Sequence, residues 1–287
     1  MKKFLSIILT ISMLFTINTF SVFAEDILIE YKKERLISIG FPERFFETNN
    51  SYMINDLYSQ YHNKVVECSS SEVIFYAENP KLDNPTTRTI SSEDLRFVIS
   101  TFTSRDEYPG ADIPPYQITE VIVFIEYCWA ERKPFCQWTD CITVNWDSNI
   151  FTLKSDSFYG YDEKKWRTGD WFTAHTYTTY EYASQNGLGY IVQLPYMGNG
   201  MDIIQHQGLS YFILLPATPH IYTVPDELLP HAYTTSIVAN YVHDMNLLLA
   251  GEITFSTEYG DVTINCSGLC DKVGTNTNYY YSYEPLS

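Results

Sequence analysis

Alternation of apolar and polar residues dominates the chain from about residue 64 onward. Short runs rich in β-branched and aromatic residues are separated there by Gly, Pro, Asn and Asp, and a period of two places successive side chains on opposite faces of a strand. The runs occupy residues 73–76, 95–102, 121–129, 141–146, 171–182, 189–194, 209–215, 236–242 and 252–266. Many short strands with closely spaced turns predict a mainly β fold, an antiparallel β-sandwich over residues 64–287.

Turn signals refine this pattern near its end. Asn199-Gly200 is typical of a tight hairpin turn, and Tyr259-Gly260-Asp261 predicts a turn or bend within the final pair of strands. Residues 278–283 read Asn-Tyr-Tyr-Tyr-Ser-Tyr. This segment fits either an edge strand or an exposed aromatic tail.

Residues 25–63 have a different pattern, with apolar residues at roughly helical intervals. A first helix is expected over 27–37, with Gly40 as its stop and Pro42 as the start of a second, short turn. Asn50 or Ser51 is placed to cap a third segment. Its apolar face carries Met53, Ile54, Leu57, Tyr58 and Tyr61. We predict a small N-terminal helical unit that docks on the domain that follows, because its apolar stripes are too small for independent stability.

Residues 1–24 have the pattern of a cleavable signal peptide. Lys2 and Lys3 provide a positive start, residues 4–23 carry no charge, and Ala24 comes directly before the acidic Glu25. Scattered Ser, Thr and Asn make the apolar run a poor membrane span. We therefore expect cleavage near Ala24, a secreted, extracellular protein, and no membrane insertion of the mature chain.

The charge of the mature chain limits its partners. Without residues 1–24 it has 16 basic and 35 acidic residues, a net charge of −19. Phosphate backbones and anionic lipid head groups would repel such a chain. Nucleic acid is therefore not expected as a partner.

Six cysteines lie in the mature part: Cys68, Cys128, Cys136, Cys141, Cys266 and Cys270. Export permits disulfides, and the even number agrees with full pairing. Six cysteines allow 15 pairings, so the sequence leaves the connectivity open. The Cys-x4-Cys and Cys-x3-Cys spacings lack the further ligands that a zinc site needs. We expect no metal site and no cofactor.

Aromatic residues are densest between Tyr127 and Asp147, where Trp129, Trp138 and Trp146 lie close in sequence. Two interpretations are open. The tryptophans could form a platform that stacks on a sugar or another planar ligand, with Asp140 or Glu131 orienting it. They could instead fill the core at a hairpin corner, which is the commoner role of strand aromatics.

This stretch also carries a resemblance. The pattern Tyr-x-Trp-x4-Pro-x4-Thr-Asp-x-Ile-x-Val-x-Trp over residues 127–146 resembles a segment of secreted β-rich proteins of Gram-positive bacteria. The Gly-Phe-Pro of residues 40–42 and the Asn-Tyr-Val-His of residues 240–243 are similar to other parts of that family. The resemblance implies export and a β-rich fold. It carries no known activity, so no catalytic residue follows from it.

Histidines and carboxylates offer weaker signals for catalysis. His243 lies beside Asp244 near the end of an expected strand. It could act as a general base oriented by Asp244 or another acid, or it could be a structural histidine. No Gly-x-Ser-x-Gly nucleophile elbow and no His-Glu-x-x-His motif occurs. Carboxylates are so abundant that pairs at glycosidase spacing are easy to propose. Glu126 stands out because it interrupts an apolar strand.

The sequence therefore favours a secreted, non-catalytic protein that contacts an unidentified surface or partner protein through aromatic side chains. No catalytic residue is assigned. A hydrolase that uses a carboxylate pair, with glycans as candidate substrates, is the alternative from another class, and a toxin-like or antagonist protein is a third. The candidate ligand-binding residues are Trp129, Trp138, Asp140, Trp146, Tyr241 and His243.

Overall fold

The structure is a computed structural model, in which the chain forms two compact units that end and begin at Val66 and Glu67. It describes residues 26–47, 50–69, 95–106, 117–129, 139–166, 169, 171–180, 182–193, 203–218, 221–224, 226–244, 250–257, 260–267 and 270–283. The expected signal peptide, the strand expected over 73–76 and the Asn199-Gly200 turn lie outside the described residues.

The N-terminal unit is helical, as the sequence predicts. A helix covers residues 26–38, a 3-10 turn η1 covers Glu43–Phe46, and the helix α2 covers Ser51–Tyr61. The Asn50 side chain caps α2 by accepting a hydrogen bond from the Met53 amide at 3.0 Å. Gly40 has a φ of 122°, and a Cβ at this position would lie 2.1 Å from the Val66 carbonyl oxygen. Only glycine fits this stop.

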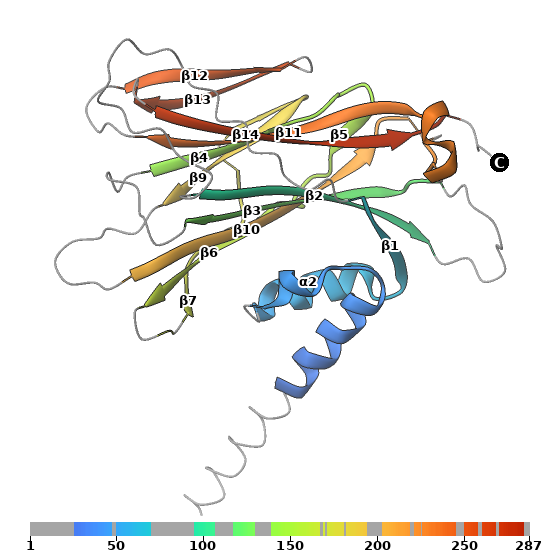
Figure 1. Ribbon diagram of the computed structural model, residues 1–287, viewed down its shortest axis with the longest axis horizontal. Coiled ribbons are helices and arrows are strands. Elements are labelled where there is room, and N and C mark those ends of the chain that lie inside the picture. The colour runs from blue at the N-terminus through green and yellow to red at the C-terminus, as the bar shows by residue number, and fades with distance from the viewer. Residues whose placement is uncertain are drawn as a thin grey trace, which may run out of the picture. The chain divides into compact units, whose positions relative to one another are not determined.

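The second unit contains two antiparallel sheets packed as a sandwich, which confirms the predicted fold class (Figure 1). We call the larger one sheet A. In spatial order it contains β1 (Lys64–Ser69), β2 (Leu95–Asp106), β3 (Glu120–Trp129), β10 (Ile203–Pro216), β6 (Tyr159–Trp166) and β7 (Trp171–Tyr177), and β5 (Phe151–Leu153) also pairs with β10.

Sheet B is the smaller layer. Its spatial order is β14 (Cys270–Tyr281), β11 (Tyr233–Asp244), β4 (Thr139–Asn145), β9 (Gly187–Gln193) and β8 (Tyr182–Ser184). A separate hairpin joins β12 (Ala250–Thr257) to β13 (Gly260–Ser267). Of the residues expected in a turn, Gly260 and Asp261 belong to β13, and Tyr259 lies outside the described residues. A 3-10 turn η2 (Asp226–His231) precedes β11.

The core between the sheets follows the alternation in β3. Val121, Val123 and Ile125 belong to the inter-sheet core together with Tyr127 and Trp129. The alternate residues Ile122 and Phe124 are also fully buried, so the early part of this strand is covered on both faces, as its sequence predicts.

The structure corrects two strand predictions. Residues 171–182 do not form one strand, because the chain leaves sheet A after Tyr177 and enters sheet B at Tyr182. Its Thr- and Tyr-rich sequence contains no Gly or Pro to mark this crossover. The sequence pattern does not predict the strand β6, because Asp162, Glu163 and the two lysines that follow are typical of a solvent-exposed segment. In the structure both acidic residues are buried.

Full cysteine pairing is contradicted by Cys128 and Cys141, whose thiols form no disulfide, and the side chains of the other four cysteines are not described. Cys128 has a free, half-buried thiol that accepts a hydrogen bond from Gln205 Nε2 at 3.0 Å. Its neighbours on the adjacent strands are Arg96 and Gln207, so no cysteine lies opposite it. Among the residues that the structure describes, no helix is both long enough and apolar enough to cross a membrane.

Candidate functional site

Four residues form one row across sheet A where the strands β3, β10, β6 and β7 pair. Gly208 lies opposite both Tyr127 and Asp162, and Asp162 lies opposite His175. A Cβ on Gly208 would lie 2.2 Å from Tyr127 Cε1, so the tyrosine ring lies directly over the glycine. Because Gly208 has no side chain, the ring can extend across β10 toward Asp162.

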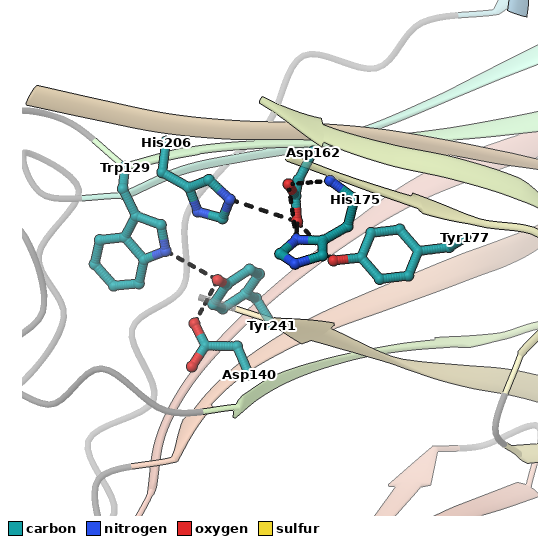
Figure 2. Close-up of polar contacts among 7 residues, drawn as sticks. All are labelled: Trp129, Asp140, Asp162, His175, Tyr177, His206 and Tyr241. Atoms are coloured by element: carbon teal, nitrogen blue, oxygen red, sulfur yellow. Dashed lines mark hydrogen bonds and ion pairs between the residues drawn. The ribbon is translucent and has the colours of Figure 1, made fainter. Parts of the chain in front are cut away.

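Asp162 is the centre of a buried hydrogen-bond cluster (Figure 2). Its Oδ1 accepts from the His175 amide at 3.0 Å, and its Oδ2 accepts from the Tyr177 hydroxyl at 2.6 Å and lies 2.9 Å from His175 Nδ1. His206 Nε2 is 3.7 Å from Oδ2. Three neighbours from two strands thus surround one carboxylate with no exposed surface.

These contacts decide the charge of Asp162. Burial by itself raises the pKa of this carboxyl, but the attraction to His206 and the hydrogen bonds from Tyr177 and His175 outweigh burial and lower the pKa. Asp162 is therefore ionised at neutral pH and can only accept hydrogen bonds. It follows that His175 Nδ1 carries a proton and that Nε2 is the basic nitrogen of that ring. The His175 side chain is 34% exposed.

Two groups near this carboxylate, His206 and the additional Tyr127, have no hydrogen-bond partner among the described residues. The Tyr127 hydroxyl and both ring nitrogens of His206 are buried and unbonded, and the two rings meet edge to face at 5.5 Å. Burial, followed by the negative charge of Asp162, raises the pKa of Tyr127 well above its ordinary value. Tyr127 is thus a neutral phenol.

A second buried cluster belongs mainly to sheet B and centres on Asp140. Its Oδ2 accepts from the Tyr241 hydroxyl at 2.5 Å, and its Oδ1 lies 2.7 Å from His243 Nδ1. The Tyr241 hydroxyl also accepts from Trp129 Nε1 at 2.9 Å. Because Trp129 belongs to sheet A, this last hydrogen bond joins the two layers (Figure 2).

Burial sets the electrostatics of this second cluster. It raises the pKa of Asp140, and the neighbouring His243 and the Tyr241 hydroxyl reduce that rise without cancelling it. Burial and then Asp140 raise the pKa of Tyr241 well above its ordinary value. The polar atoms of this cluster are satisfied by one another inside the sandwich.

The structure brings together four of the six candidate ligand-binding residues: Trp129, Asp140, Tyr241 and His243. Trp146 is separate from them and packs against Phe212 at 5.7 Å. All five are buried, which agrees with the core-filling interpretation of the tryptophans. Trp138 lies outside the described residues, and ligand binding by this set stays a prediction.

The acid that contacts His243 is Asp140 from β4, which is the other acid that the sequence left open beside Asp244. The strand register explains this, since Val242 pairs with Cys141 and the next pair of positions joins residues 243 and 140. Sequence reasoning missed Asp162 and His206 because only strand pairing places them together. Glu126, the other suggested acid, is partly exposed and lies 3.9 Å from Arg96.

The chemistry that the contacts of Asp162 and His175 allow is proton transfer. No group of three or more His, Cys, Asp or Glu side chains within the described ranges could hold a metal ion. The Asp162–His175 pair fixes one ring tautomer and leaves a basic nitrogen on a partly exposed histidine, as a general base requires. Asp162 is buried and His175 is partly exposed, and this arrangement suits either a general base or a structural ion pair.

A surface feature lies about 33 Å along β11 from His243, given ten residues at the strand rise of about 3.3 Å. We call Tyr233, Tyr281 and Tyr283 the tyrosine patch. Tyr233 stacks on Tyr281 at 5.8 Å and meets Tyr283 at 5.1 Å. Tyr233 and Tyr283 are 56% and 40% exposed, whereas Tyr281 is nearly buried beneath them.

This patch settles the open question about residues 278–283. Residues 278–281 form the end of β14, which is an edge strand of sheet B as far as the described residues go, and residues 282 and 283 follow it. Tyr279 faces the core and donates to or accepts from Thr103 at 2.7 Å, while Tyr280 faces outward. Both alternatives of the sequence are therefore partly realised: the segment is an edge strand, and it presents tyrosines to solvent.

Comparisons with known proteins identify no family. No protein-family model matches the sequence, and no curated protein matches it. Among solved structures, the chain is similar to the pilus 2b backbone protein of group B streptococcus, with 10% identity over 54% of this chain and 78% of that one and a TM-score of 0.28.

Two further solved structures have similarly low scores. A protein named BspA_C_mut has 7% identity over 65% of this chain and 56% of that one, with a TM-score of 0.28. AvmM, which catalyses macrocyclization in alchivemycin A biosynthesis, has 12% identity over 71% of this chain and 99% of that one, with a TM-score of 0.25. At these scores the similarities support no functional conclusion.

Proposed function

We propose that this protein is an exported, non-catalytic binding protein that holds a partner through the tyrosine patch. The observation that carries the proposal is the location of the exposed large hydrophobic side chains. In the β unit, three large hydrophobic side chains are described and exposed, and two of them, Tyr233 and Tyr283, belong to the patch. The third, Tyr280, lies on the other face of β14. Exposed aromatic residues gathered at one place are typical of a contact surface.

The chemistry of the patch suits binding. Tyrosine supplies a large rigid face at low conformational cost and a hydroxyl that donates and accepts hydrogen bonds. Burial and contact with Tyr283 raise the pKa of Tyr281, so this phenol stays neutral at any physiological pH. The buried partner ring beneath Tyr233 also restricts how the exposed rings move, which reduces the entropy lost on binding.

The test is a selection that makes no assumption about the partner. The mature chain, residues 25–287, is screened against a random peptide display library and a glycan array, and every ligand is measured again on a Tyr233→Ser/Tyr283→Ser variant. The matched control is Tyr52→Ser in the N-terminal unit, because Tyr52 is 57% exposed and lies outside the patch. We expect at least a tenfold loss of affinity in the double variant and less than twofold in the control. Ligands that bind both variants equally would refute the proposal.

A hydrolase is the second candidate, because the ionised Asp162 holds the partly exposed His175 in the tautomer that a general base needs. The mature chain is assayed on peptide and glycan substrates beside His175→Ala and His243→Ala. Turnover that His175→Ala abolishes, and that His243→Ala reduces only in step with protein stability, would establish the hydrolase and exclude the non-catalytic proposal.

A further inference from the structure

Basic residues are nearly missing from the last part of the chain. Residues 168–287 contain one lysine, Lys272, and no arginine. The same stretch contains eleven acidic residues: Asp170, Glu181, Asp202, Asp226, Glu227, Asp244, Glu252, Glu258, Asp261, Asp271 and Glu284. A chain with 18 basic residues in total therefore concentrates nearly all of them before residue 168.

The fold converts this asymmetry along the sequence into an asymmetry between the sheets. Lys272 is the only lysine or arginine in the five strands of sheet B. It lies nine residues before Tyr281 on β14, about 30 Å away at the rise of about 3.3 Å per strand residue. The tyrosine patch is thus built on strands that carry no positive charge near it.

Negative charge reaches the patch from the neighbouring turn. Asp147, which follows β4, is close enough to contribute to the raised pKa of Tyr281 after burial and Tyr283. At the same end of sheet A, Lys154 is neutralised by Glu120, with Nζ and Oε1 2.5 Å apart. A ligand at the patch therefore meets aromatic faces in a negative field.

We propose that the partner held by the tyrosine patch is a segment of another protein that carries lysine or arginine side chains; this inference rests on the proposed function. Ammonium and guanidinium groups bind the faces of tyrosine rings, and nearby carboxylates add Coulomb attraction. The net charge of the chain also attracts such a segment over a distance of about 10 Å at ordinary ionic strength. A neutral glycan would use the rings but gain nothing from the charge.

The test uses four synthetic twelve-residue peptides in which threonine alternates with arginine, lysine, glutamine or glutamate. Each is titrated calorimetrically into the mature chain, the Tyr233→Ser/Tyr283→Ser variant and the Tyr52→Ser control, in low and high salt. We expect the arginine and lysine peptides to bind, to lose at least tenfold in affinity in the double variant and in high salt, and to bind the control normally. The glutamine and glutamate peptides should bind at least tenfold more weakly.

The outcomes separate this inference from the proposed function. Glutamine or glutamate peptides that bind as tightly as the arginine peptide, and still require the tyrosines, would overturn the cationic partner and leave the contact surface standing. Arginine peptides that bind the double variant unchanged, or that do not bind at all, would also overturn the inference. The proposed function itself is decided by the library selection described above.

Discussion

Tyr241→Phe is the most informative single change in the core, because it removes one oxygen atom and keeps the ring. The lost hydroxyl donates to Asp140 and accepts from Trp129 Nε1. Among the described residues, the Tyr241 hydroxyl forms hydrogen bonds with these two groups only. Phenylalanine therefore leaves the Asp140 carboxyl and the Trp129 N–H unpaired in a site that is closed to solvent.

The cost can be estimated from the two hydrogen bonds. A buried donor or acceptor that loses its partner costs about 1–3 kcal/mol, and a bond to a carboxylate lies toward the upper end. Partial relaxation makes the two losses less than additive, so we expect about 3 kcal/mol of lost unfolding free energy. For a unit of this size, about 1 kcal/mol corresponds to roughly 2–4 °C, which gives a fall in melting temperature of roughly 6–12 °C.

Urea unfolding followed by circular dichroism measures this difference, with Tyr280→Phe as the matched control. Tyr280→Phe makes the same chemical change on an exposed residue of β14 and should cost less than about 0.5 kcal/mol. If Tyr241→Phe destabilises the protein no more than Tyr280→Phe, the Asp140 cluster does not hold the two sheets together and our interpretation of the core is wrong.

Three further predictions concern the same core. Burial raises the pKa values of Tyr127, Tyr190 and Tyr241, so the folded state keeps protons that the unfolded state releases above about pH 10. Stability is therefore lost as the pH rises, and at pH 11 the three tyrosines together cost about 4 kcal/mol of unfolding free energy. Absorbance at 295 nm should show these tyrosines titrating only as circular dichroism reports unfolding. Because its pKa is lowered, Asp162 stabilises the fold above the ordinary carboxyl pKa of about 4, and this contribution is lost as the pH falls through the pKa of the folded state. Asp162→Asn should therefore make the unfolding free energy fall less steeply with decreasing pH. An unchanged acid part of the stability curve would contradict this. Gly208→Ala places its Cβ within 2.2 Å of the Tyr127 ring and should cost about 1–3 kcal/mol in chemical unfolding, whereas the same change in a Tyr127→Ala background should cost less, and equal costs would refute the packing.

The fold class followed from local pattern, because a strand that buries one face must alternate its side chains whatever its partners are. The same reasoning placed the N-terminal unit: the Asn50 cap, the Gly40 stop and the apolar face of α2 are all local properties of a helix. It failed at β6, where Asp162 and Glu163 are buried by neighbours far away in sequence. A charged strand is recognisable only once its partners are known.

Strand register, by contrast, decided the clusters. Asp140 and His243 are 103 residues apart, and Trp129 and Tyr241 are 112 residues apart, so no spacing in the sequence relates them. The aromatic-rich segment did indicate that Trp129, Asp140 and Trp146 were special, yet sequence alone left open whether they face a ligand or the core. Sheet packing answers this, because the inward face of β3 is covered by β11 and β4.

The tyrosine patch shows the same division. The sequence determined that residues 278–283 are rich in tyrosine and that the last 120 residues are almost free of positive charge, since both are properties of composition. Only the tertiary structure decided which tyrosines are exposed. Pairing of β14 with β11 turns Tyr279 inward, and it brings Tyr233 against Tyr281, although 48 residues separate them in the sequence. Composition fixes what a surface can be made of, and strand pairing decides which side chains reach it.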